Sequence, residues 1–139
     1  MSTGVEQLEA WQRERLKTVL GNYAWVGIEL VSIGGGEASV RVPCPPELEV
    51  GGLFNGGILA GLLEVPSYIA LLTELRENET PVTNDLFVQH LRGVPADAEI
   101  VLDGKLIRRG RTMAWTEASA RADGKLTTQA RITKSLLAG

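Results

Sequence analysis

One carboxylate stands alone in the most apolar part of this chain. Glu64 is the only charged residue between Val50 and Thr73, and it lies inside the apolar run 58–65. Apolar residues in this region recur at helical spacing over about four turns, which predicts a helix buried on most of its surface. Burying a lone carboxylate is costly, so such a residue must be paired, protonated or functional. The chain must therefore fold around a buried helix that accommodates one acidic group.

The residues just before this helix predict a binding site for a negatively charged oxygen. Asn55 can cap the helix, while Gly56 and Gly57 leave its first amides free of side-chain cover. A carbonyl oxygen bound to these amides would receive hydrogen bonds and feel the positive end of the helix dipole. Glu64 follows roughly two and a half turns later. Together these features suit attack on an acyl group.

Composition bounds the class of protein. With 139 residues, 44% of them hydrophobic, the chain predicts one domain, 1–139, with a real core. A net charge of −3 and a pI near 5.2 argue against binding to nucleic acid. The single cysteine cannot form an internal disulfide and the polar N-terminal stretch lacks the apolar core of a signal peptide, so we expect a cytoplasmic protein. No apolar stretch reaches the roughly 20 residues of a membrane-spanning helix, so no membrane partner is expected.

The order of the expected elements indicates an α+β fold. They are a helix at 5–20, hairpin strands at 27–33 and 37–42, the buried helix, and four β-type runs at 81–91, 98–108, 112–122 and 125–136. Thr3 is a plausible cap for the first helix, and Pro66 should kink the buried one. A helix packed against one antiparallel sheet follows from this order. The strand 82–91 is apolar on both faces, and one of those faces is a candidate subunit interface.

Three stretches of the chain carry a resemblance to a known family. They are Gly52-Leu53-Phe54-Asn55-Gly56-Gly57 followed by Glu64, Val82-Thr83-Asn84-Asp85-Leu86, and Arg109-Gly110-Arg111-Thr112 running on to Ile132-Thr133-Lys134. Over residues 20–137 the chain resembles the hotdog-fold acyl-CoA thioesterases of the phenylacetate-degradation (PaaI) type, a group that includes the thioesterase superfamily member 2 proteins. The resemblance implies a hotdog fold, with a long central helix wrapped by an antiparallel sheet. Residues 1–21 would form an extra N-terminal helix and 22–137 the hotdog core.

The resemblance also implies an activity, hydrolysis of an acyl-CoA or related acyl thioester to the free acid and thiol. In the family, a catalytic Asp or Glu lies nine residues after a histidine that starts the long helix, and Glu64 has this spacing from Asn55. Glu64 would therefore activate water or attack the carbonyl, and the amides of Gly57 or Gly56 would hold the oxyanion. Thr83, expected from a neighbouring subunit, would place the water.

The same resemblance sets the expected partners. It implies a homodimer or homotetramer with active sites between subunits, and CoA enters only as part of the substrate. No separate cofactor and no metal are expected, since the chain has one histidine and no cysteine pair at ligand spacing. The further substrate-binding candidates are Glu49, Tyr68, Arg108, Arg109 and Arg111. The three arginines would meet the CoA phosphates, and Tyr68 could touch the acyl group.

Two departures from the family pattern keep alternatives open. Asn55 replaces the usual histidine, and Glu49 stands where many members carry an Asn or Gln that helps to orient the thioester. If Glu49 faces the site, its negative charge would repel that of Glu64. One alternative is therefore a hotdog protein that binds acyl-CoA without hydrolysing it. A dehydratase is a third interpretation, but the only histidine, His90, is far from the helix start in sequence.

Simpler interpretations compete with the catalytic ones. Glu64 could be a buried carboxylate paired with an Arg, Asn55 a plain helix cap, and Thr83 an ordinary β-branched strand residue. Tyr68 also suits a core position, and arginines beside a hairpin turn are commonly solvated.

Overall fold

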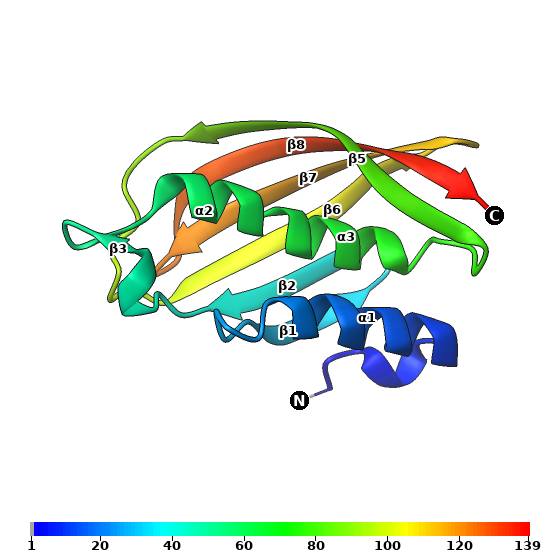
Figure 1. Ribbon diagram of the computed structural model, residues 1–139, viewed down its shortest axis with the longest axis horizontal. Coiled ribbons are helices and arrows are strands. Elements are labelled where there is room, and N and C mark those ends of the chain that lie inside the picture. Colours follow the sequence, from blue (N-terminus) through cyan, green and yellow to red (C-terminus); the bar gives the residue numbers. More distant parts are fainter. Residues whose placement is uncertain (1) are drawn as a thin grey trace.

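A curved antiparallel sheet wraps around a helix that is divided in two (Figure 1). The computed structural model describes residues 2–139. Its helices are η1 (Val5–Gln7), α1 (Ala10–Asn22), η2 (Pro46–Leu48), α2 (Gly56–Leu62) and α3 (Glu64–Leu72). Its strands are β1 (Glu29–Gly34), β2 (Glu37–Val42), β3 (Glu49–Val50), β4 (Leu53–Phe54), β5 (Glu79–His90), β6 (Ile100–Arg109), β7 (Met113–Ala122) and β8 (Lys125–Ala138). The main sheet has the order β1-β2-β6-β7-β8-β5, and β3 pairs with β4 separately. The predicted α+β architecture is confirmed.

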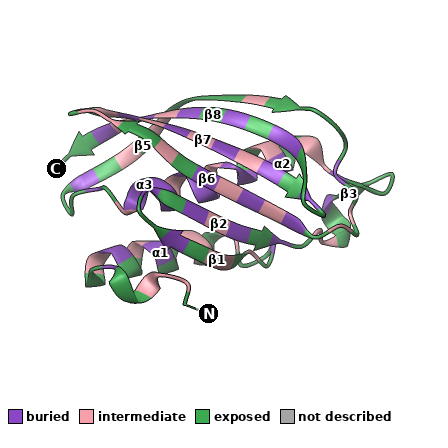
Figure 2. Cartoon of the chain, turned by 180° about the vertical axis from the view of Figure 1, so that it is seen from behind, coloured by how far each residue is buried: buried purple, intermediate pink, exposed green. Residues whose placement is uncertain are grey.

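Small residues on β7 and at one position of β6 let the helix approach the inner face of the sheet closely. Along β7 the burial alternates with the period of two expected of a strand with one face in the core, as Figure 2 shows for several strands. The inward residues of β7 include Ala114, Ala118 and Ala120. On β6 the nearest residue is Gly104, where an added Cβ would lie 2.2 Å from the carbonyl oxygen of Pro66. Helix α3 therefore rests directly on the backbone of β6.

The central helix begins and breaks where its sequence dictates. Asn55 caps α2, because its side-chain oxygen accepts a hydrogen bond from the Ile58 amide at 3.2 Å. Leu63 separates α2 from α3, and Pro66, which has no amide hydrogen, follows within one turn. The predicted interruption is confirmed. Glu64 is consequently the first residue of α3, at a bend in the helix.

The N-terminal segment differs from the single helix expected at 5–20. It forms the short turn η1 and then α1, because the chain is extended at Leu8, whose side chain is buried. Glu9 and Gln12 form the capping box of α1, so Thr3 is not its cap. Gln12 also donates its side-chain amide to the carbonyl of Leu72 at 3.0 Å. Helix α1 is thereby fixed against the end of α3.

Strand β5 forms one edge of the sheet. It pairs with β8 and, within residues 2–139, with no other strand. Its exposed apolar side chains are Val82, Leu86 and Phe87, and Leu91 follows directly. An unpaired edge that carries apolar side chains is a template for pairing with another chain. Among the helices of residues 2–139, none is long and apolar enough to cross a membrane.

Candidate active site

Glu64, Thr83 and Lys134 form a polar cluster between the helix and the sheet, which we call the carboxylate cluster. The Thr83 hydroxyl lies 2.8 Å from Oε1 of Glu64 and 3.0 Å from Oε2. The ammonium of Lys134 lies 3.3 Å from Oε1 of Glu64 and 3.0 Å from Oγ1 of Thr83. The Lys134 side chain is 5% exposed and that of Glu64 is 30% exposed. The cluster is therefore rooted in the core and opens to the surface through Glu64.

The pairing of β5 with β8 brings the cluster together. Thr83 and Lys134 are directly opposite each other in that pairing, and both side chains point towards the helix. The bend at Leu63 places Glu64 above them at the start of α3. Thr83 thus reaches the Glu64 of its own chain rather than being supplied by a neighbouring subunit, which corrects that expectation.

Lys134 was missed as a site residue, although it ends one of the stretches that resemble the family. The simpler interpretation of Glu64 expected an Arg partner, and the structure supplies a lysine instead. The sequence did contain a signal. Lys134 occupies an inward position of β8 between Ile132 and Leu136, both buried, and a lysine at such a position is almost never unpaired.

The start of α2 forms a second group, which we call the helix-start group: Asn55, Gly56, Gly57 and His90. Gly57 is exposed, and, its chain neighbours and the helix backbone aside, the one atom of residues 2–139 found within 4 Å of where its Cβ would be is the Asn55 side-chain oxygen, at 3.5 Å. At Gly56 an added Cβ would lie 3.4 Å from Nε2 of His90. The other ring nitrogen, Nδ1, lies 3.2 Å from the hydroxyl of Thr128. His90 is far from the helix start in sequence but adjacent to it in space. Its distance in sequence therefore does not exclude it from the site.

The two groups are separated within one chain. Gly57 and Glu64 are seven residues apart on the helix, which corresponds to about 10 Å along its axis. A reacting carbonyl must lie within hydrogen-bonding distance of its oxyanion donors and close to its attacking group. The oxyanion donors and the carboxylate of one chain are too far apart to act on the same carbonyl.

Glu49 belongs to the helix-start end of the molecule. It lies on β3 opposite Phe54 and borders a small hollow together with Cys44 and Asp97. Burial, and then the charge of Glu49, raise the pKa of the Cys44 thiol. A thiol with a raised pKa holds less thiolate, so this cysteine is poorly suited to be a nucleophile.

Tyr68 lies on α3 and is half-buried against the core. Burial raises the pKa of Tyr68, and the positive charge of Arg15 from α1 opposes that rise. Arg15 also lies over the ring of Trp11 and donates to the carbonyls of Glu77 and Glu79. Arg15 therefore helps to anchor α1, and contact of Tyr68 with an acyl group stays a prediction.

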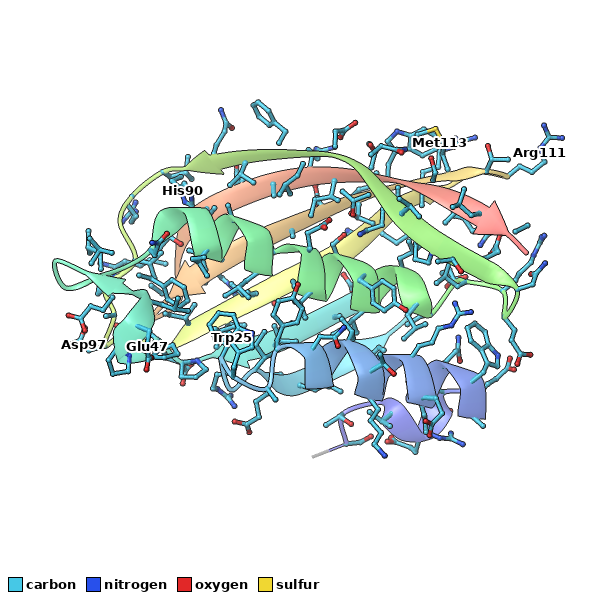
Figure 3. All side chains as sticks on the ribbon, viewed as in Figure 1. Trp25, Glu47, His90, Asp97, Arg111 and Met113 are labelled. Carbon is cyan, nitrogen blue, oxygen red and sulfur yellow. The ribbon has the colours of Figure 1, made fainter. Side chains whose placement is uncertain are left out.

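The three arginines expected near the CoA phosphates have different surroundings. Arg109 forms two hydrogen bonds, 2.6 and 2.5 Å long, to the carboxylate of Glu79. Arg108 lies over the ring of Trp115 at 5.2 Å. Arg111 is exposed in the β6–β7 turn, and Figure 3 shows it at the end of the sheet remote from His90. Arg109 is thus committed to an internal ion pair, whereas Arg111 is accessible to a ligand.

No grouping of three potential metal ligands occurs among the His, Cys, Asp and Glu side chains of residues 2–139.

Comparison with known proteins identifies the family. The family model described as the thioesterase superfamily matches residues 51–134, which include both groups of site residues. The comparison with curated proteins found no match. The solved structure of thioesterase HI1161 from Haemophilus influenzae is 25% identical, with a TM-score of 0.79, covering 90% of this chain and 90% of that one. The fold is that of the hotdog thioesterases.

Two further solved structures share the fold. A hypothetical thioesterase from Streptococcus pneumoniae, solved with coenzyme A, is 17% identical with a TM-score of 0.78, covering 88% of this chain and 97% of that one. The phenylacetic acid degradation protein PaaI from Thermus thermophilus, a mutant, is 20% identical with a TM-score of 0.75, covering 84% and 99%. At these identities the two structures show that the fold is shared.

Proposed function

The chain belongs to the thioesterase superfamily, and from this premise we propose that it hydrolyses an acyl-CoA, or a related acyl thioester, to the free acid and thiol. The observation that carries the proposal is the carboxylate cluster, in which a partly exposed Glu64 is held by Thr83 and Lys134. Coenzyme A in the similar Streptococcus structure supports CoA as the thiol carrier.

Glu64 acts as a general base in the proposed reaction. Its carboxylate takes a proton from water as the water oxygen bonds to the acyl carbon. The amides of Gly57 and Gly56, at the positive end of α2, stabilise the oxyanion that forms. When the carbon–sulfur bond breaks, Glu64 returns the proton to the leaving sulfur. One thioester and one water thus become one carboxylic acid and one thiol.

A complete site requires two copies of the chain, because the carboxylate and the oxyanion donors of one copy are about 10 Å apart along the helix. The free edge of β5 offers the means. Thr83 lies beside Glu64 in the first half of β5, and His90, the last residue of the strand, lies beside Gly56. Antiparallel pairing of two β5 strands, with Leu86 opposite Phe87 of the second copy, sets Thr83 opposite the partner's His90. The carboxylate cluster of one copy then faces the helix-start group of the other.

The alternative is an acyl-CoA-binding protein that does not hydrolyse its ligand. It is favoured by one observation: the Glu64 carboxylate already accepts hydrogen bonds from the Thr83 hydroxyl and the Lys134 ammonium. Tight binding of acyl-CoA without release of thiol would establish it.

The proposal is tested by measuring thiol release from short, long and aromatic acyl-CoAs. Glu64→Gln keeps the size of the side chain and removes the base, so turnover should fall roughly 10²- to 10⁴-fold. Glu14→Gln, at an exposed position on α1, is the matched control and should retain full activity. Equal turnover by the wild-type protein and Glu64→Gln would refute the mechanism, and absence of release from every thioester would refute the activity.

A further inference from the structure

Lys134 is placed at the candidate site by contacts that the proposed chemistry has not yet used. Among residues 2–139 it is the only lysine that the fold buries, with 4% of its surface exposed. Its ammonium touches two other polar side chains, Glu64 and Thr83. A lysine kept inside a core must be paired, and this pairing occurs at the carboxylate that the reaction needs.

The direction of each hydrogen bond in the cluster follows from the donors available. A lysine ammonium has donors only, so Oγ1 of Thr83 must accept at 3.0 Å from Lys134. The single hydroxyl proton of Thr83 is then directed towards Glu64, whose oxygens lie 2.8 and 3.0 Å away. Lys134 therefore determines the direction in which the Thr83 hydroxyl points.

The same contacts make the two oxygens of Glu64 unequal. Oε1 lies within reach of both Lys134 and Thr83, whereas Oε2, among residues 2–139, lies within reach of Thr83 alone. Oε2 consequently keeps more capacity to accept a proton. Thr83 also keeps one lone pair, because a hydroxyl oxygen can accept twice and Lys134 uses one position.

We propose that Lys134 is a positioning residue for thioester hydrolysis, an inference that rests on the proposed function. It holds Glu64 by Oε1 and turns Thr83 so that Oε2 and the free lone pair of Thr83 receive the two protons of one water. A water that donates both protons has a lone pair left to attack the acyl carbon. Lys134 touches neither water nor substrate in this arrangement and acts through the other two residues.

The experiment compares Lys134→Met with Lys134→Arg and with Lys125→Met, an exposed lysine at the start of the same strand. Misplacing a reacting group by about 1 Å costs up to about 10²-fold in rate, so we expect kcat of Lys134→Met to fall roughly 10- to 100-fold. KM should stay within about twofold, because Lys134 does not bind substrate. Lys134→Arg should recover part of kcat through its own donors, and Lys125→Met should match the wild-type protein.

A double variant separates positioning from a merely structural role. If Lys134 acts through Glu64, adding Lys134→Met to Glu64→Gln should cause no further loss of kcat. A lower thermal midpoint with unchanged kcat per folded molecule would overturn the inference, as would wild-type kcat in both Lys134→Met and Lys134→Arg. If Lys134→Met does not fold, Lys134→Gln takes its place with the same expected kcat.

The outcomes also separate this inference from the proposed function. Thiol release that depends on Glu64 but not on Lys134 overturns only the role of Lys134. Absence of thiol release from the wild-type protein overturns the proposed function, and the positioning role with it.

Discussion

Gly104→Ala tests the close contact between helix α3 and strand β6. A Cβ at this position would lie 2.2 and 2.3 Å from the carbonyl oxygen and carbon of Pro66, and 2.8 Å from the amide nitrogen of Ser67. All three are backbone atoms of α3, so no side-chain rotation relieves the overlap. Ordinary contact needs about 1 Å more, and the helix itself must move. Ser67 resists that movement, because its hydroxyl is bonded to Thr116 at 2.6 Å in the core.

The expected cost follows from overpacking. Adding a methyl group to a well-packed core costs typically 1–3 kcal/mol, and backbone overlap places this site near the upper end. We therefore expect a loss of about 2–3 kcal/mol in the free energy of unfolding, or roughly 5–10 °C in the thermal midpoint for a domain of this size. Turnover should fall as well, because Glu64 begins the helix that is displaced.

Urea unfolding followed by tryptophan fluorescence measures this loss. Protein concentration must be held fixed, since a dimer couples unfolding to dissociation. The matched control is Gly21→Ala, near the end of α1, where nothing lies within 4 Å of the added Cβ. That variant should be neutral or gain up to about 1 kcal/mol. If Gly104→Ala is as stable as Gly21→Ala, the contact between α3 and β6 tolerates an added methyl group, and the predicted overpacking is refuted.

Three further predictions address the Arg109–Glu79 ion pair, the proposed pairing of two chains through β5, and the Thr83 hydroxyl. Arg109 lowers the pKa of Glu79 from 4.5 to about 2, so the folded state binds fewer protons than the unfolded state between these values. The stabilisation from Glu79, about 3 kcal/mol at neutral pH, should therefore be lost as pH falls through this window, and unfolding curves of the wild-type protein and Glu79→Gln should converge near pH 2. Leu86→Lys should convert a dimer to an inactive monomer in sedimentation analysis, whereas Leu137→Lys should do neither; a fully active monomeric wild-type protein would contradict the shared site. Thr83→Val should lower kcat roughly 10- to 100-fold while Thr83→Ser retains most of it, and equal rates would exclude a role for the hydroxyl.

Local patterns predicted the elements better than their arrangement. The four β-type runs after the helix became β5, β6, β7 and β8, because alternation and turn residues are local signals. The order of strands is not local. β5 crosses to the far edge and pairs with β8, and β6 pairs with β2, so these two pairs of neighbours in the sheet are distant in the chain. These pairings depend on which faces meet around α3.

The residues of the candidate site also divide into those that local sequence patterns reveal and those that only the fold brings together. Glu64, Asn55 and the two glycines were found from the sequence because one helix carries them at fixed spacing. Lys134 entered the site through the register of β5 with β8, which no single stretch of sequence records. Sequence reasoning finds the groups that one element carries, and the fold supplies the groups that orient them.

His90 bears on the most evident departure from the family, the asparagine at position 55. Asn55 stands where the resemblance expects a histidine, which leaves the helix start with a cap but no imidazole of its own. The end of β5 brings one there, since Nε2 of His90 faces Gly56 while Thr128 engages Nδ1. The orientation of the ring is therefore set by the sheet rather than by the helix. Because β5 also carries Thr83 at the carboxylate cluster, a single edge strand provides a side chain to each half of the site. A change in the pairing of β5 would thus disturb both halves together, whereas a change within α2 would disturb only one.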